Sequence, residues 1–385
     1  MNLAYLRHFA SRARAVVQHR GVTRVLGELA SQSLFALLAD ATARARSGIA
    51  AHLAKALAIP LRPTIGSLYL NVSHTDFDLP SHSAWLHRHA LRAIYLIHDL
   101  IPILHPDHCR PRAVVRHTGR VDAALRHGSG IIVGSAAVAR DLEDYAGRRR
   151  SSTPPVAISA LAGATLDSTA TRCSDLGDFF LCVGTIESRK NHLLLLRAWE
   201  RLRERLGPST PRLVIVGRWG TGSEEFREAL DRSGMSGNLI EVLDHCGDDE
   251  LATMMATARA MLMPSLAEGF GLPMAEALRM GVPVIASDLP CFREVGQGIP
   301  CLLDPHDVAA WVARIVALDQ ATARRQRKVD ALHGYRASTW DQHFARVDPW
   351  LAEIASSPAR SADLGTTSAS APARAPDGRT LDLEI

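Results

Sequence analysis

The sequence has no long hydrophobic run. No stretch reaches the roughly 18 uninterrupted apolar residues that a membrane-spanning helix needs. The N-terminus also lacks the pattern of a secretory signal, because basic residues from Arg7 to Arg14 interrupt it and no cleavage site follows an apolar core. These absences argue against an integral membrane protein or a secreted one, and we expect a cytoplasmic protein.

Cysteine and aromatic residues are also scarce. The six cysteines are scattered and none belongs to a Cys-x-x-Cys pair, so we expect reduced thiols rather than a disulfide framework or a zinc site. Aromatic residues make up 5% of the chain, too few to interleave with basic residues on a nucleic-acid surface. No Gly-x-Gly-x-x-Gly motif follows a predicted strand. Neither nucleic acid nor a nicotinamide cofactor is therefore an expected partner.

The small net charge of +4 hides an asymmetry between the two halves of the chain. Residues 1–150 carry 20 Lys and Arg against 10 Asp and Glu, whereas the remaining residues carry 24 against 30. A basic half beside an acidic half suggests that the first half meets something anionic, such as lipid headgroups, nucleic acid or a phosphorylated substrate. Scattered surface arginine is the plain alternative interpretation of the same counts.

Length and composition predict a globular protein of two or three domains. The 385 residues are 47% hydrophobic and 22% charged, which is ordinary for a globular chain. Residues 1–60 read as mostly helical, with apolar residues at helical spacing over 22–38. Beyond them, short apolar strands alternate with helices, which indicates parallel sheets covered on both faces. The predicted strands are 66–72, 93–97, 131–135, 179–184, 212–217, 239–243, 260–264 and 283–286, and the predicted helices are 136–145, 190–206, 224–232, 248–258 and 273–280.

A stretch rich in Ser, Thr, Ala, Arg and Pro at 146–178 marks the predicted boundary between two domains. We expect an N-terminal domain at 1–170 and a C-terminal domain at 171–340. A helix at 341–355 would follow, with a return to the N-terminal domain as one interpretation. The tail at 356–385 is rich in Ser, Ala, Thr and Pro, has little to bury, and is predicted to be disordered.

The loop at 184–191 places Arg189 and Lys190 where a strand has ended and a helix begins. Cations are unusual there, because the helix dipole favours negative charge at a helix N-terminus. The arrangement makes sense if both side chains and the helix start hold an external anion such as a diphosphate. Two solvated bases at an exposed helix start are the structural alternative.

The loop at 264–276 combines glycines with two carboxylates. Gly269 and Gly271 let the backbone approach a ligand closely, and Pro273 suits the first turn of a helix. Glu268 lies on the loop and Glu276 about one turn into the helix. The two carboxylates can therefore grip hydroxyl groups at separate points of one extended ligand.

The run from Glu268 to Glu276 resembles the Glu-x7-Glu signature of family 4 retaining glycosyltransferases, and residues 184–191, 216–218 and 281–288 match the same family. The resemblance is dense over 179–312 and looser over 66–145. It implies the GT-B fold, an α/β architecture of two Rossmann-like, doubly wound parallel-sheet domains that face each other across a cleft. In the looser part, residues 95–102 together with Arg116 and His117 look like bacterial transferases of O-antigen or exopolysaccharide synthesis, several of which use GDP-mannose.

The resemblance also implies roles for individual residues. Arg189 and Lys190 would bind the diphosphate and stabilise it as it leaves, and Glu276 would hold the ribose hydroxyls. Glu268 would contact the donor sugar, and His98 or Asp99 would lie across the cleft near the anomeric carbon. Further donor-binding positions would be Gly184, Gly217, Arg218, Leu243, Ser265, Gly269, Phe270, Gly271 and Leu272, and the acceptor side would include Gly21 and Arg24.

The implied activity is transfer of a sugar, with mannose from GDP-mannose as one candidate, from a nucleotide donor to a saccharide or a lipid-pyrophosphate-linked saccharide. The N-terminal domain would serve the acceptor and the C-terminal domain the donor. No metal or other cofactor is expected. The basic N-terminal half would contact an anionic membrane, which would place the protein peripherally on the inner face of the plasma membrane. Two alternatives are a non-catalytic nucleotide-sugar-binding subunit and a GT-B sugar-nucleotide epimerase.

Overall fold

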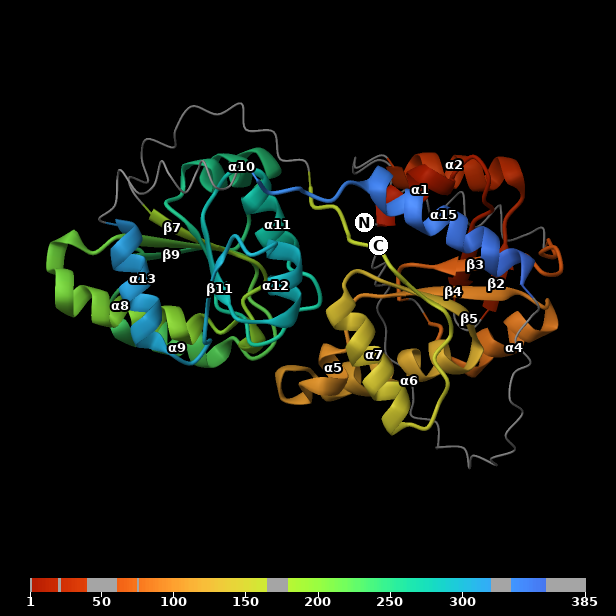
Figure 1. Cartoon of the computed structure of the whole chain (residues 1–385), viewed down its shortest axis with the longest axis horizontal. Helices are drawn as coiled ribbons and strands as arrows, with labels where there is room; N and C mark the ends of the chain where they lie inside the picture. The colour runs from red at the N-terminus through yellow and green to blue at the C-terminus, as the bar shows by residue number, and fades with distance from the viewer. Residues whose placement is uncertain are drawn as a thin grey trace.

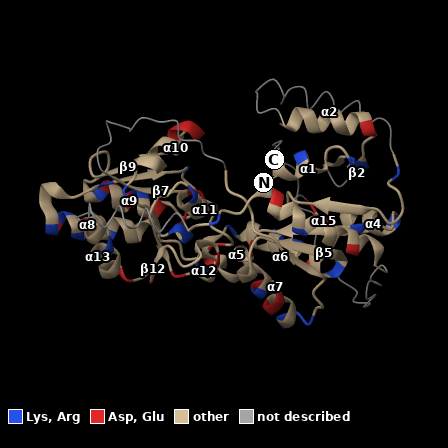
Figure 2. Ribbon diagram, turned by 45° about the horizontal axis from the view of Figure 1, so that its top comes forward, with Lys and Arg blue, Asp and Glu red and all other residues tan. Residues whose placement is uncertain are grey.

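The computed structural model describes residues 2–19, 22–39, 61–74, 76–164, 179–319 and 334–357. These residues form two lobes, each built around a parallel sheet (Figure 1). Acidic and basic residues are interspersed over both lobes (Figure 2). No helix within the described part of the chain has the length and apolar character needed to span a bilayer.

The N-terminal lobe contains a four-stranded parallel sheet with the order β3-β4-β5-β6. Its central strands β4 and β5 are almost entirely buried, as expected for aliphatic strands covered on both faces. The strands are β3 (Leu68–Asn71), β4 (Arg92–Ile97), β5 (Gly128–Val133) and β6 (Val156–Ile158). The helices between them are α4 (Pro80–Arg88), α5 (Ile101–Leu104), α6 (Pro111–His127) and α7 (Ala136–Arg148).

The first 39 residues are less helical than the sequence predicts. β1 (Val16–His19) pairs with β2 (Val22–Val25) as an antiparallel hairpin between α1 (Asn2–Phe9) and α2 (Glu28–Ala39). The helix expected over 22–38 therefore begins only at Glu28. The β-branched residues Val22, Thr23 and Val25 favour an extended backbone. This preference outweighs the helix that the spacing of apolar residues predicts.

The last described helix, α15 (Trp340–Ser356), lies against the N-terminal sheet (Figure 1). Phe344, Val347 and Leu351 of this helix share a buried cluster with Ile94 and Ile132 of the sheet. Its start is fixed by a capping box in which Thr339 and Gln342 satisfy each other's backbone N–H groups. The end of the described chain is thus part of the core of the N-terminal lobe.

The C-terminal lobe contains a six-stranded parallel sheet with the order β12-β11-β10-β7-β8-β9. This doubly wound arrangement confirms the predicted α/β class. The strands are β7 (Phe179–Val183), β8 (Arg212–Val216), β9 (Ile240–Leu243), β10 (Met261–Met263), β11 (Val284–Ser287) and β12 (Cys301–Leu303). The helices are α8 (His192–Leu206), α9 (Glu224–Ser233), α10 (Asp248–Thr257), α11 (Leu272–Arg279), α12 (Pro290–Gly296) and α13 (Val308–Asp319).

The strand order reverses at β7. From this strand the chain moves to β8 and β9 on one side and later to β10, β11 and β12 on the other. The connections that follow β7 and β10 consequently lead the chain in opposite directions along the sheet. Such a switch point is where open α/β sheets bind their ligands.

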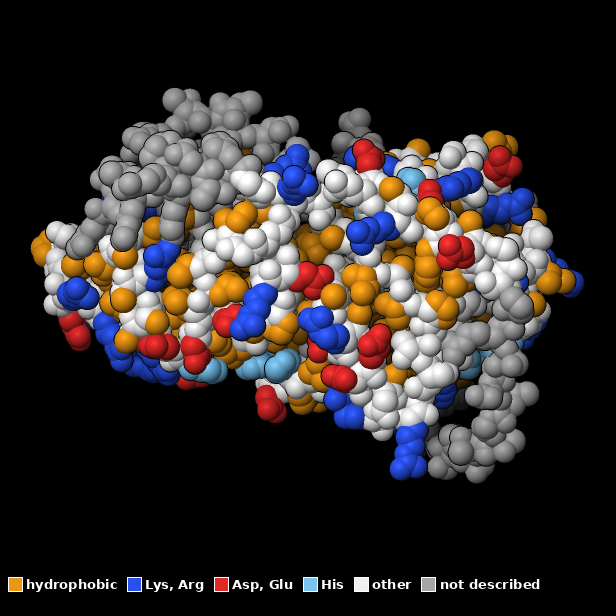
Figure 3. All heavy atoms as spheres, viewed as in Figure 1, with side chains coloured by type: hydrophobic (Ala, Val, Ile, Leu, Met, Phe, Trp, Pro, Cys, Tyr) orange, Lys and Arg blue, Asp and Glu red, His pale blue; other side chains and the backbone are white. Residues whose placement is uncertain are grey.

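The two lobes touch along this edge, and their side chains meet in the space-filling view (Figure 3). Ser135, which caps α7, donates a hydrogen bond of 2.8 Å to the carbonyl oxygen of Gly269. The carboxylate of Glu294 accepts hydrogen bonds from the backbone N–H groups of Ala136 and Ala137 at the N-terminus of α7. A third contact joins His108 Nδ1 to Ser188 Oγ at 2.9 Å.

The packing of α15 on the sheet predicts the effect of a single methyl group. A Cβ added at Gly130 of β5 would lie 2.5 Å from Cη2 of Trp350, so Gly130→Ala should force the helix away and cost about 1–3 kcal/mol of unfolding free energy. Gly147→Ala in α7, where a Cβ would have no neighbouring atom within 4 Å, should stabilise the protein by up to about 1 kcal/mol. Urea unfolding of both variants checks this, and equal midpoints would contradict the packing.

Candidate active site

The predicted donor loops meet at the switch point of the C-terminal sheet. One follows β7 and runs through a short 3-10 turn, Ser188–Lys190, before α8 begins at His192. The other follows β10 and leads into α11. They are tied together by a backbone hydrogen bond of 2.7 Å from the N–H of Leu266 to the carbonyl oxygen of Arg189.

Arg189, Lys190 and Glu268 form one cluster of charges. Arg189 Nη1 lies 3.1 Å from Glu268 Oε2, and Lys190 Nζ donates to Glu268 Oε1, which also accepts a bond of 2.9 Å from Ser265 Oγ. The Glu268 side chain is only 9% exposed. Burial would raise the pKa of its carboxyl group, but Lys190 and Arg189 outweigh burial and hold that pKa below its ordinary value. Glu268 is therefore a buried anion stabilised by two cations.

The backbone around the cations explains how they reach this position. The sequence predicts Arg189 and Lys190 at the start of the helix, but both lie in the 3-10 turn that precedes it. Asn191 ends that turn in the left-handed conformation, with φ of 56°. Its side-chain nitrogen, Nδ2, donates hydrogen bonds to the carbonyl oxygens of Pro264 and Pro305. Gly184, with φ of 138°, leaves room for the Lys190 amine, which would lie 3.4 Å from a Cβ at that position.

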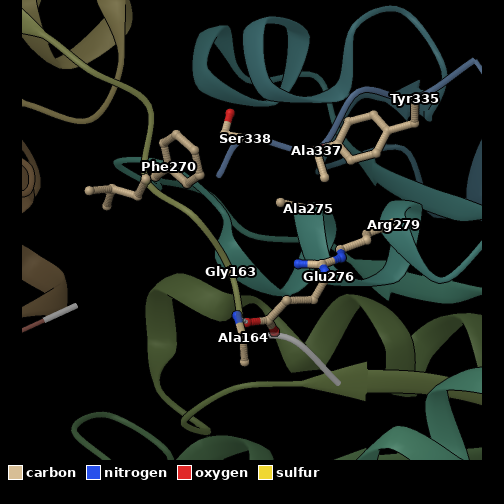
Figure 4. Close-up of a pocket in the computed structure, with 10 residues that line it drawn as sticks. Gly163, Ala164, Phe270, Ala275, Glu276, Arg279, Tyr335, Ala337 and Ser338 are labelled. Carbon is tan, nitrogen blue, oxygen red and sulfur yellow. Dashed lines mark hydrogen bonds between the residues drawn. The ribbon is translucent and has the colours of Figure 1, made fainter. Parts of the chain in front are cut away.

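Glu276 lies in a separate small pocket, one turn into α11. Its Oε1 accepts a hydrogen bond of 2.8 Å from the backbone N–H of Ala164, in the segment that leaves the N-terminal lobe (Figure 4). Burial raises the pKa of Glu276, and Asp248 adds to the rise, although the bond from Ala164 opposes it. The pocket, lined also by Arg279 and Tyr335, encloses only about 10 Å³, which is room for one water molecule.

The glycines of the second loop bring it directly against the N-terminal lobe. A Cβ at Gly269 would lie 2.4 Å from the carbonyl oxygen of His98 and 2.8 Å from Cβ of Asp99. Gly271, with φ of 91°, packs against the ring of Phe292. Asp99 Oδ1 accepts a hydrogen bond of 2.9 Å from the N–H of Ile101, the first residue of α5. His98 and Asp99 therefore border the donor loop, and which of them faces a sugar stays a prediction.

The remaining predicted donor positions support the loops in different ways. Gly217 donates its N–H to Leu243, and a Cβ there would collide with the carbonyl oxygen of Gly184, so only glycine fits between the strand ends. Leu243 is half-buried, whereas Arg218 is exposed. Phe270 is buried in the core of the C-terminal lobe, and Leu272 is the first residue of α11 and packs against that core.

The predicted acceptor residues do not belong to the charged cluster of Arg189, Lys190 and Glu268. Arg24 lies on β2, where its exposed guanidinium donates to the carbonyl oxygen of Thr23. The mostly helical structure predicted for residues 1–60 is wrong at this place, because β1 precedes Arg24 and pairs with β2. Gly21 lies outside the described residues.

A set of charges after β3 was not among the predicted site residues. Asp76 and Asp78 form an Asp-x-Asp tripeptide, and both carboxylates accept hydrogen bonds from Arg116 of α6 at 2.8–2.9 Å. The tripeptide in a loop after a strand was the signal that could have found it. Among the described residues, no group of three or more His, Cys, Asp or Glu side chains is arranged to hold a metal ion.

Comparison with known proteins adds the family context. Residues 177–320 match the model of glycosyl transferases group 1. The chain is 28% identical over 271 residues to the serotype-specific mannosyltransferase WbdA of Escherichia coli, which covers 65% of this chain and 32% of WbdA. It is 35% identical over 138 residues to the O-antigen chain mannosyltransferase B of Escherichia coli, 36% of each chain. The chain thus spans about a third of the length of these relatives.

Solved structures agree on the fold. A UDP-forming α,α-trehalose-phosphate synthase from Burkholderia xenovorans superposes with a TM-score of 0.59 at 14% identity, covering 89% of each chain. TarM superposes with a TM-score of 0.58, also at 14% identity, covering 89% of this chain and 63% of TarM. The chain therefore has the GT-B fold, and its residues 177–320 are similar to the glycosyl transferases group 1 domain.

Proposed function

We propose that the protein is a retaining glycosyltransferase that moves mannose from GDP-mannose to a saccharide, or a lipid-pyrophosphate-linked saccharide, during synthesis of a cell-surface polysaccharide. One observation carries the proposal: Arg189 and Lys190 both pair with Glu268 at the switch point of a doubly wound sheet, and Arg189 pairs with Glu187 as well. The names of the similar mannosyltransferases support the choice of mannose and of the polysaccharide.

The cluster offers a site for a leaving diphosphate. A pyrophosphate at this edge would replace Glu268 as the partner of Arg189 and Lys190, since both are charge-assisted donors that suit phosphate oxygens. Their positive charge would stabilise the negative charge that develops on the phosphate as the glycosidic bond breaks. We expect the two side chains to do this without a metal ion. Glu268 would then be free to accept hydroxyl groups of the donor sugar.

Transfer with retention needs no protein nucleophile in this scheme. The bond between the anomeric carbon and the phosphate oxygen breaks while the acceptor hydroxyl attacks from the same face. The acceptor oxygen forms the new glycosidic bond, and its proton passes to the departing phosphate oxygen. The lobes supply the enclosure for this chemistry, because Gly269 of one lobe already touches His98 and Asp99 of the other.

Glu276 would recognise the ribose. Its carboxylate accepts one backbone N–H from Ala164, and the 2′ and 3′ hydroxyls of a nucleotide are donors of the same kind. The enclosed space of about 10 Å³ is too small for a ribose, so a nucleotide would have to displace the Ala164 segment from the carboxylate.

Lys190→Ala should abolish most of the affinity for a nucleoside diphosphate, because a cation that meets the phosphates directly is removed. We expect the Kd for GDP, measured by calorimetry, to rise by about 10- to 100-fold, the equivalent of one or two charge-assisted hydrogen bonds. Arg205→Ala, on the exposed end of α8, is the matched control and should bind GDP normally.

GDP release from GDP-mannose by the natural protein should persist in excess EDTA. Unchanged GDP affinity in Lys190→Ala would refute the diphosphate site.

Glu276→Ala should remove the preference for ribose hydroxyls. The natural protein should bind GDP about 10-fold or more tightly than 2′,3′-dideoxy-GDP, because the carboxylate is left without its partners in the second complex. Glu276→Ala should bind the two nucleotides with equal affinity. The substitution should weaken the affinity for GDP and leave the affinity for 2′,3′-dideoxy-GDP unchanged. A variant that keeps the full preference would show that Glu276 does not contact the ribose.

We also propose peripheral contact of the N-terminal lobe with an anionic membrane on the cytoplasmic side. Arg7 and Arg14 are exposed near α1, and Leu29 of the neighbouring α2 is 80% exposed. Exposed basic residues beside an apolar side chain suit a headgroup surface, and a lipid-linked acceptor would be presented there.

Sedimentation with vesicles tests this contact. The protein should bind vesicles that contain phosphatidylglycerol and not vesicles of phosphatidylcholine alone, and binding should weaken with salt. The double variant Arg7→Glu and Arg14→Glu should bind at least about 10-fold more weakly, since each basic residue near an anionic surface contributes about 1 kcal/mol. Arg232→Glu on α9, an exposed arginine of the other lobe, is the control. Equal binding of both variants would exclude this face.

A further inference from the structure

Three histidine rings gather at the edge of the N-terminal lobe that faces the donor loop. His74 follows β3, His98 follows β4 and His117 lies on α6. The ring centre of His74 is 4.7 Å from that of His98 and 5.8 Å from that of His117. The carbonyl oxygen of His98 is the atom that Gly269 approaches, and Asp99 interacts electrostatically with Arg189 across the boundary. The histidine cluster thus borders the proposed diphosphate site.

Two of these rings have a defined tautomer. Nε2 of His74 lies 2.7 Å from the carbonyl oxygen of Leu96, and Nε2 of His117 lies 2.9 Å from the carbonyl oxygen of Asp99. A carbonyl oxygen can only accept, so both Nε2 atoms carry the hydrogen. In a neutral ring the other nitrogen, Nδ1, then has a free lone pair. Each ring therefore presents a hydrogen-bond acceptor at Nδ1.

The surroundings keep the rings neutral. Burial lowers the pKa of His74 to about 3 and that of His98 to about 4, and it also lowers the pKa of His117. Arg120, held 3.6 Å from Asp78, adds positive charge that disfavours protonation of His74 and His117. At neutral pH the cluster is therefore a group of uncharged rings.

Uncharged acceptors suit a ligand that is itself an uncharged donor. Anions would be repelled by the lone pairs, and no group of three His, Cys, Asp or Glu side chains in the described ranges has the arrangement of a metal site. Sugar hydroxyls are donors of the required kind. On the basis of the proposed function, we propose that Nδ1 of His74 and Nδ1 of His117 accept hydrogen bonds from hydroxyl groups of a sugar at the reaction centre. That sugar is either the one transferred or the acceptor.

Two substitutions at each position separate this role from a structural one. Glutamine keeps a donor near the place of Nε2, so it preserves the bond to the backbone carbonyl and removes the Nδ1 acceptor. Asparagine does the reverse, because its amide lies near Nδ1, and it also tolerates the left-handed φ of 59° at His74. Binding of a sugar predicts that glutamine is the harmful change and that asparagine restores part of the loss. A purely structural role predicts the opposite order.

The experiment measures GDP release from GDP-mannose, with and without methyl α-D-mannopyranoside as an acceptor probe, together with Kd values for GDP and GDP-mannose. His74→Gln and His117→Gln should each lower kcat/KM by about 3- to 10-fold, the effect of one lost neutral hydrogen bond, and leave the Kd for GDP unchanged. A raised Kd for GDP-mannose would assign the histidines to the transferred sugar, and a raised KM for the methyl mannoside alone would assign them to the acceptor. His87→Gln on the exposed face of α4 is the control.

The outcomes distinguish this proposal from the proposed function. If the natural protein turns over GDP-mannose and the glutamine variants match it, the histidine assignment is wrong and the proposed function stands. The same conclusion follows if asparagine is the more harmful substitution. If the natural protein neither binds GDP nor releases it from GDP-mannose, the proposed function itself fails, and this assignment fails with it.

Discussion

The ion pairs of Glu268 with Arg189 and Lys190 are the interaction on which the site depends. A carboxylate this deeply buried is costly unless cations compensate it, and here two cations do so from a loop 78 and 79 residues away in the sequence. The pairing keeps both cations at the edge of the sheet, where a diphosphate would meet them. In the proposed function, Glu268 is the counter-ion that a diphosphate would replace.

The contact between the lobes depends on the same edge. Ser135 binds the backbone of the Glu268 loop at Gly269, and Glu294 caps α7 of the opposite lobe. Direct hydrogen bonds therefore connect the loops at the switch point to the N-terminal lobe. Glu276 links the lobes in another way, because its present partner is Ala164 of the connecting segment.

Much of the fold could be predicted from local pattern, and the errors have physical reasons. Five strands of the C-terminal sheet, β7 to β11, are short apolar runs, and the structure has them within one residue of the predicted bounds, whereas β12 was not predicted. The hairpin at β1 and β2 was missed because apolar spacing was given more weight than β-branching over residues 22–25. The place of Arg189 and Lys190 before α8, rather than in it, depends on a left-handed Asn191 that is anchored to Pro264 and Pro305.

The sequence by itself determined the alternation of strands and helices and the chemistry of each loop, because apolar period, glycine and charge act locally. The tertiary structure alone decided which loops meet. Strand order brings the β7 and β10 loops together, the return of α15 completes the N-terminal core, and three separate elements assemble His74, His98 and His117. Contacts of this kind depend on how whole elements pack, so no local pattern records them.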